Sequence, residues 1–123
     1  MAKFWLLSGA VCGLLSVVLG AFGAHALKGV LDDYGRSVYE KAVHYQMFHT
    51  MALLAVGILQ QNWRETNLAP AGAAFLLGIV LFSGSLYLLA VTGIRWLGVV
   101  TPLGGTAFII GWLWLIYAMA RKI

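Results

Sequence analysis

The sequence predicts an all-α membrane protein in which four transmembrane helices pack as a small bundle, in a single domain over residues 1–123. Three observations support this prediction. Of the 123 residues, 62% are hydrophobic and only 10% are charged, whereas a soluble domain carries about 25% charged residues. Four apolar segments follow one another, each close to the roughly 20 residues that cross a bilayer. Short polar connections separate them, so lipid is the expected surroundings of the bundle.

The first span is expected over residues 4–24, an apolar run that follows Lys3. The stretch Ala24-His25-Ala26 is similar to a signal-peptide cleavage site, but the apolar run exceeds the roughly 7–15 residues of a signal core. Small residues recur along the run at spacings of three or four, namely Gly9, Gly13, Ser16, Gly20 and Ala24. Such a face lets another helix approach closely in lipid, so we predict a permanent span.

The second span is expected over residues 37–61. Its apolar part, residues 45–60, is short for a membrane crossing. Ser37 and Glu40 have the spacing of a capping box, in which two side chains satisfy free backbone donors at a helix N-terminus. We therefore predict that this helix begins at Ser37 and that its first turns stand in the headgroup region.

The third and fourth spans are expected over residues 70–92 and 103–120. The third begins at Pro70, and the fourth follows Pro102; proline is favoured at the first position of a helix. Glycines in these and the earlier spans are expected where helices approach closely. These glycines are Gly9, Gly13, Gly20, Gly23, Gly84, Gly104 and Gly105.

Four spans place both termini on the same side of the membrane. Lys and Arg normally mark the cytoplasmic side, but here they divide equally: Lys3, Arg64, Arg121 and Lys122 on the side of the termini, and Lys28, Arg36, Lys41 and Arg95 on the other. Because Arg121 and Lys122 abut the end of a span, we expect the termini in the cytoplasm. The basic residues form no run, which argues against nucleic acid as a partner.

Polar residues gather in the half of the bundle that is remote from the termini. The expected cluster consists of His25, His44, Tyr45, Gln46, His49, Ser83, Ser85 and Thr106, with Thr50, Tyr87 and Thr101 in the same half. Polar groups inside a bilayer are costly unless they face the bundle and find partners. We therefore expect His25 and His49 to converge, with Ser83, Ser85 or Thr106 as the hydrogen-bond partner of His49.

The cluster has two interpretations. Its side chains can hydrogen-bond across helices and hold the bundle together, or they can form a proton-, ion- or ligand-handling pocket that uses histidine. A metal site is not expected, because His44 and His49 are separated by about 140° around a helix. The single cysteine, Cys12, belongs to no metal-binding spacing.

No catalytic residue and no cofactor are predicted. The stretch Ser83-Gly84-Ser85 is superficially similar to a hydrolase nucleophile, but the G-x-S-x-G pattern is missing, because Leu81 and Tyr87 stand where glycines would be needed. The stretch TPLGG at 101–105 has no Lys-Ser/Thr after it, so it is not a phosphate-binding loop.

Four stretches together resemble one known family: LGAFGAH (19–25), YQMFHT (45–50), VLFSGSLY (80–87) and VTPLGG (100–105). They are similar to domain of unknown function 423, also called uncharacterised protein family 0382, and above all to its bacterial inner-membrane members. The resemblance implies a multi-pass protein of the bacterial plasma membrane, and it carries over no catalytic role.

We therefore expect a non-enzymatic membrane protein that acts by interaction or assembly. The lipid bilayer is its expected partner, a homo-oligomer is possible, and no small-molecule ligand is identified. The alternative is a small transporter or permeation component with a His/Ser polar pocket between its helices. A wide polar cavity lined by His25, His49 and Ser83 would favour transport, and a fully hydrogen-bonded cluster would favour a structural role.

Overall fold

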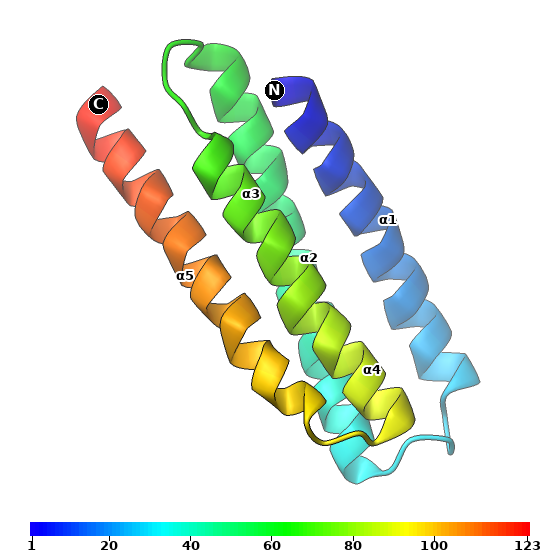
Figure 1. The fold of residues 1–123 in the computed structure, drawn as a ribbon. Coiled ribbons are helices and arrows are strands. Elements are labelled where there is room, and N and C mark those ends of the chain that lie inside the picture. The colour runs from blue at the N-terminus through cyan, green and yellow to red at the C-terminus, as the bar shows by residue number, and fades with distance from the viewer.

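The computed structural model describes residues 1–123, and it consists of four long antiparallel helices (Figure 1). The first two are α1, Ala2–Ala26, and α2, Asp33–Asn62. The third comprises α3, Ala69–Gly78, the π-helical turn η1, Ile79–Ser83, and α4, Gly84–Thr92; the fourth is α5, Leu97–Lys122. All four are long and apolar enough to cross a membrane. The prediction of an all-α fold with four transmembrane helices is confirmed.

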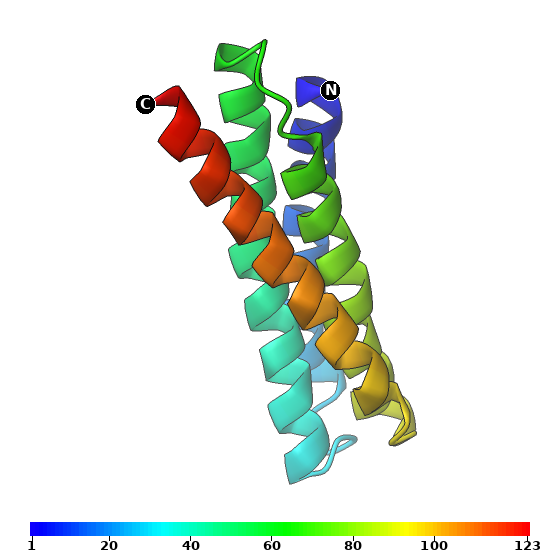
Figure 2. The same cartoon turned by 60° about the vertical axis from the view of Figure 1, so that its left-hand side comes forward.

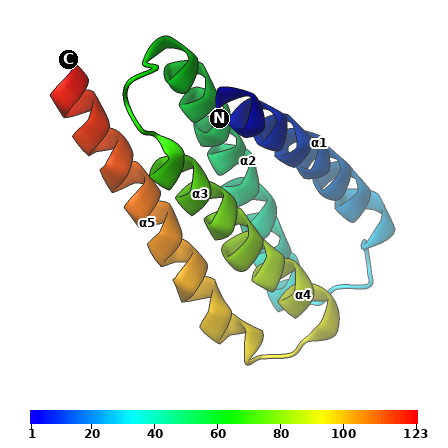
Figure 3. The ribbon, with the colours of Figure 1, turned by 45° about the horizontal axis from the view of Figure 1, so that its top comes forward.

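The two middle helices, α2 and α3-η1-α4, are flanked by α1 on one side and by α5 on the other (Figures 1 and 3). Both termini lie at the same end of the bundle (Figure 1). Seen after a 60° turn, α5 runs obliquely across the other helices (Figure 2). Helix α1 packs mainly on α2, whereas α5 packs on α3, η1 and α4. Helices α2 and α5 have few close backbone contacts, and a groove lies between them.

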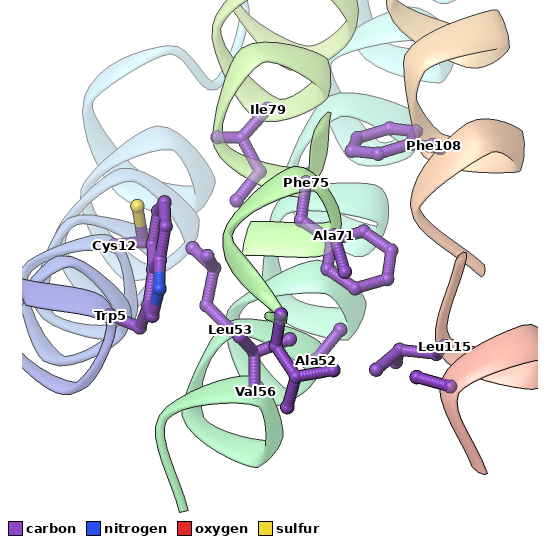
Figure 4. Packing of buried hydrophobic residues seen from close by; sticks show 12 residues of the cluster. Trp5, Cys12, Ala52, Leu53, Val56, Ala71, Phe75, Ile79, Phe108 and Leu115 are labelled. Atoms are coloured by element: carbon purple, nitrogen blue, oxygen red, sulfur yellow. The ribbon is translucent and has the colours of Figure 1, made fainter. Parts of the chain in front are cut away.

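The main apolar core lies between the two middle helices and extends to both flanks (Figure 4). Leu53 and Val56 of α2 meet Phe75 of α3 there, and all three side chains are completely covered. Trp5 of α1 closes this core on one side and Phe108 of α5 closes it on the other. The buried polar residues of α2 lie next to this core, because His49 stacks on Phe108 and Gln46 bonds to the carbonyl of Cys12.

Helix α2 begins earlier than predicted. Its N-cap is Asp32, whose Oδ1 accepts a hydrogen bond of 2.6 Å from the backbone N–H of Gly35. Ser37 lies inside the helix and its side chain is exposed, so the capping-box interpretation of Ser37 and Glu40 is wrong. Aspartate is among the strongest N-cap residues, and placing it one turn earlier gives a helix of 30 residues.

Helix α5 also begins earlier than predicted, at Leu97. Pro102 is therefore inside the helix and is not its first residue. Because proline has no N–H, the carbonyl of Gly98 loses its helical partner. Gly98 is exposed near the end of the bundle, where water or lipid headgroups can bond to this carbonyl.

Candidate functional site

Gln46 connects three helices through its side chain. It lies on α2 with only 3% of its surface exposed. Its Nε2 donates a hydrogen bond of 3.0 Å to the carbonyl of Cys12 on α1. Its Oε1 accepts one of 2.6 Å from the hydroxyl of Tyr87 on α4. Both the nitrogen and the oxygen of the amide are thus hydrogen-bonded, so Gln46 holds α2 to both α1 and α4.

The two serines of the third helix bond in opposite directions. The hydroxyl of Ser83, which is completely buried, donates to the carbonyl of Ala42 on α2 at 2.7 Å. The hydroxyl of Ser85 lies 2.6 Å from that of Thr101 on α5 and also donates to the carbonyl of Phe82. The π-helical turn η1 ends at Ser83, and the two serines tie the third helix to its neighbours on both sides.

His49 joins α2 to α5. Its ring stacks on Phe108 with centroids 3.5 Å apart and an interplanar angle of 8°. The indole N–H of Trp112 donates to His49 Nε2 at 3.1 Å, and His49 Nδ1 lies 2.8 Å from the carbonyl of Tyr45. A carbonyl can only accept, so Nδ1 carries the proton and Nε2 offers its lone pair to Trp112. The contacts therefore define one neutral tautomer of His49.

The predicted partners of His49 are wrong, because neither Ser83, Ser85 nor Thr106 bonds to its ring. The hydroxyl of Thr106 is exposed and donates to the carbonyl of Pro102 within its own helix at 2.8 Å. The partner found, Trp112, is one that we did not predict. Phe108 and Trp112 are four residues apart on α5, and this spacing was the signal for one aromatic face turned towards α2.

The polar residues do not form the single cluster that we predicted. His25, His44 and Tyr45 have exposed side chains, and His25 does not approach His49. Helix α1 meets α2 through the face that contains Cys12 and Ser16. His25 follows Ser16 by nine residues, which is a rotation of about 180°, so it points away from that face.

The glycines of α1 lie along its contact with α2. A Cβ atom added at Gly9 would lie 2.9 Å from Leu54 Cγ, and one at Gly23 would lie 2.6 Å from the hydroxyl of Tyr39. The corresponding distances are 3.3 Å to Thr50 Cγ2 at Gly13 and 3.4 Å to Val43 Cγ1 at Gly20. The first two positions therefore need glycine for close approach, and the other two have slightly more room.

The glycines of the third and fourth spans differ from one another. A Cβ atom at Gly104 would lie 2.7 Å from Phe82 Cα, so α5 meets the backbone of η1 there. A Cβ atom at Gly84 would meet nothing within 4 Å, and one at Gly105 would meet only Phe82 Cδ2, at 3.9 Å. Our expectation of close helix contacts is wrong for Gly84 and Gly105.

A lateral groove of about 760 Å³ follows the gap between α2 and α5. We call it the α2–α5 groove. Its lining includes the aromatic rings of Phe48, His49, Phe82, Phe108 and Trp112, several of which contact one another. The rest of its lining consists of His44, Tyr45, Pro102, Gly105, Thr106 and Ile109. The groove is thus largely apolar. Four residues of the predicted polar cluster also line it: His44, Tyr45, His49 and Thr106.

The sequence matches the family model described as protein of unknown function (DUF423) over residues 19–105. The chain belongs to this DUF423 family. It is 51% identical over 114 residues to the UPF0382 membrane protein SH2409 of Staphylococcus haemolyticus, which covers 93% of each chain. It is 44% identical over 120 residues to the UPF0382 membrane protein YwdK of Bacillus subtilis, which covers 97% of this chain and 98% of that one. No solved structure matches.

This DUF423 protein is a membrane protein with four transmembrane helices, as its relatives' names and its own apolar helices agree. The matched region contains Gln46, His49, Ser83, Ser85 and Thr101, whereas Trp112 and Cys12 lie outside it. The contacts of His49 with α5 and of Gln46 with α1 therefore reach beyond the part that the family model matches.

The polar side chains of the DUF423 protein mainly form hydrogen bonds between helices. No three side chains among His, Cys, Asp and Glu lie close enough together to hold a metal ion. Two buried polar atoms have no partner, Trp5 Nε1 and Thr50 Oγ1. Neither residue lines the α2–α5 groove. Gln46, His49, Ser83 and Ser85 each bond to a neighbouring helix, whereas the buried Ser16 donates to the carbonyl of Cys12 within its own helix.

Proposed function

We propose that this DUF423 protein is a non-enzymatic component of the bacterial plasma membrane that acts by assembly, first of all with a second copy of itself. The observation that carries the proposal is the pairing of its buried polar side chains. Gln46, Ser83 and His49 bond to neighbouring helices, and these are the groups that catalysis or permeation would need free.

Transport is less well supported than assembly. A polar path would require side chains that exchange partners as a solute passes. His49 has both ring nitrogens engaged, and protonating its Nε2 would set two donors, His49 and Trp112, against each other. Ser83 is completely covered and bonds to a backbone carbonyl. Each group would have to give up a helix-to-helix bond to carry a proton or a solute.

Assembly is supported by the α2–α5 groove. In lipid, helices associate through close packing, and small residues favour that approach. Gly105 and Thr106 line the groove beside aromatic rings, and a Cβ atom at Gly105 would meet only Phe82 Cδ2, at 3.9 Å. A helix from a second copy would pack its side chains against these rings.

Cysteine cross-linking in native membranes tests the proposal. In a Cys12→Ala background, which removes the single native thiol, Ile109→Cys places a thiol at the α2–α5 groove. Leu14→Cys is the matched control, because both side chains are exposed, at 61% for Ile109 and 64% for Leu14. We expect a short bismaleimide to give covalent dimers of Ile109→Cys and to leave Leu14→Cys monomeric.

Other cross-linking results would change or contradict the proposal. Dimers of Leu14→Cys alone would keep self-assembly and move the contact to α1. Monomers in both variants, with single-step photobleaching of a labelled chain in nanodiscs, would contradict self-assembly.

The alternative remains a small transporter, favoured by one observation: His44, Tyr45 and Thr106 border the same groove. Proteoliposomes loaded with a pH-sensitive dye test it. We expect no proton flux above that of empty vesicles. A proton flux that His44→Gln abolishes while the bundle stays folded would support transport and contradict the assembly proposal.

A further inference from the structure

A second groove lies at the end of the bundle remote from the termini, between the last turns of α1, the connection 27–32 and the first turns of α2. Its volume is about 540 Å³. We call it the α1–α2 groove. Its lining consists of Gly20, Gly23, Ala24, Leu27, Lys28, Leu31, Arg36, Tyr39, Glu40, Val43, His44 and Met47. It is separate from the α2–α5 groove, with which it shares only His44.

The lining of the α1–α2 groove changes from charged to apolar with depth. Lys28 lies just beyond α1, and Arg36 lies in the first turns of α2. Gly20 and Met47 lie farther into the bundle, and Met47 is about 16 Å along the helix axis from Arg36. One end of the groove is thus at headgroup level and the other faces the hydrocarbon.

The charges of the groove have a positive balance. Lys28 and Arg36 are exposed cations, and Glu40 is the one carboxylate in the lining. Lys28, Arg36 and Glu40 together carry one net positive charge. The neighbouring charges, Asp32, Asp33 and Lys41, are not part of the lining; the Asp32 carboxylate caps α2.

We propose that the α1–α2 groove binds an anionic phospholipid. The phosphate lies by Lys28 and Arg36, and an acyl chain lies along Gly20, Val43 and Met47. A single negative charge balances the groove, and Lys and Arg side chains near the membrane surface attract anionic headgroups. The apolar depth of the groove distinguishes a lipid from a free phosphate ion, which would use only the charged end.

The tyrosine at the back of the groove holds its shape. Tyr39 is buried, and its hydroxyl donates a hydrogen bond of 2.6 Å to the carbonyl of Leu19 on α1. Gly23 leaves room for the ring. The distance between α1 and α2 is therefore set by protein contacts at this level, and the groove exists before a lipid enters it.

Native mass spectrometry of the full chain in a neutral maltoside detergent tests the headgroup contacts. The probe is phosphatidylglycerol, with phosphatidylcholine of the same chains for comparison. We expect saturable binding of phosphatidylglycerol and weaker binding of phosphatidylcholine. Lys28→Gln and Arg36→Gln should each weaken the binding of phosphatidylglycerol about fivefold. Lys41→Gln is the matched control and should leave it unchanged, and Glu40→Gln should strengthen it.

A second pair of variants tests the acyl-chain contact. Ala24 and Ala21 are both exposed on α1, but only Ala24 lines the groove. Ala24→Leu should displace phosphatidylglycerol, and Ala21→Leu should not. Glycerol phosphate, which has the anion without the chains, should not compete.

Three results would overturn the proposal. An equal loss of binding in Lys41→Gln would mean diffuse attraction to a charged surface. Competition by glycerol phosphate would mean a soluble phosphate ligand. Equal binding of the two lipids, or dimers linked through Ala24→Cys in a Cys12→Ala chain, would mean that a neutral chain or a second copy fills the groove. Every substituted residue except Cys12 is exposed, so each variant can be checked against its parent chain for an unchanged unfolding temperature in detergent without lipid.

Discussion

Gln46 shows at the scale of single residues why a polar side chain persists in the middle of a membrane helix. Its amide supplies a donor for the Cys12 carbonyl and an acceptor for the Tyr87 hydroxyl. An unpaired amide in hydrocarbon would cost several kcal/mol (roughly 2–7). The same logic applies to Ser83 and His49, and it makes the pairs testable one at a time.

A double-mutant cycle measures the bond between Gln46 and Tyr87. Tyr87→Phe removes the donor, and Gln46→Leu removes the acceptor. Because the two atoms are 2.6 Å apart, we expect the losses of unfolding free energy to be non-additive by about 0.6–1.7 kcal/mol. Unfolding in mixed micelles of increasing SDS content is the measurement. Tyr117→Phe, on the exposed Tyr117 of α5, is the control and should cost nothing. Strict additivity would mean that this bond contributes no stability.

The contact of His49 with Trp112 is the second test at this scale. Trp112→Phe keeps an aromatic ring but removes the indole donor, leaving His49 Nε2 without its partner. We expect a loss of about 1 kcal/mol in unfolding free energy. Trp96→Phe is the matched control, because Trp96 is 66% exposed. A loss in Trp112→Phe no larger than in the control would show that ring stacking on Phe108, without the hydrogen bond, holds α5 in place.

The residues of the candidate site could be predicted from sequence only in part. Hydropathy and topology indicate which half of the bundle is polar, and Gln46, His49, Ser83 and Ser85 are indeed buried there. Their partners depend on how each helix is rotated about its axis, which one sequence does not determine. His25 points away for this reason. Trp112 was not predicted as a partner because α5 has aromatic residues on several sides. Only the packing of the helices determines which of these residues faces α2.

At the scale of elements, the helix ends depend on competition between neighbouring caps. Both Asp32 and Ser37 are capable N-cap residues, and the helix extends as far as the earlier one allows. We expect Asp32→Ala to lower the unfolding free energy by about 1 kcal/mol and Ser37→Ala to leave it within error, as measured by SDS titration. A larger loss of unfolding free energy in Ser37→Ala than in Asp32→Ala would indicate that the helix begins at Ser37.

Two glycines that look alike in the sequence have opposite roles in helix packing. At Gly104 an added Cβ would lie 2.7 Å from the backbone of Phe82, which cannot move aside easily. Gly104→Ala should therefore cost about 1–3 kcal/mol. Gly84 has helical backbone angles and no atom within 4 Å of an added Cβ, so Gly84→Ala should be neutral or stabilise the helix by up to about 1 kcal/mol. Equal effects of the two variants on SDS unfolding would contradict the close contact of α5 with η1.

At the scale of the whole molecule, the fold could be predicted because the bilayer restricts it. Every backbone polar group in hydrocarbon must be bonded internally, so an apolar segment of this length has to be a helix. The grooves could not be predicted in the same way. They depend on α1 packing mainly on α2 and on α5 packing on the third helix, a choice among several ways of arranging four helices that hydropathy does not distinguish.

The arrangement of the termini leads to the last prediction. Residues 1 and 123 lie at the same end of the bundle (Figure 1), so reporters fused there should indicate the same side of the membrane, and a reporter inserted at Gly29 the other. Opposite results from the two terminal fusions would contradict four crossings. Because Lys and Arg are divided equally between the two sides, Arg121 and Lys122 should decide the orientation. Gln at both positions should increase the fraction of inverted chains, whereas the exchange Arg121→Lys with Lys122→Arg keeps the charge and should not. An unchanged orientation with Gln would mean that charge at the C-terminal end does not set the topology.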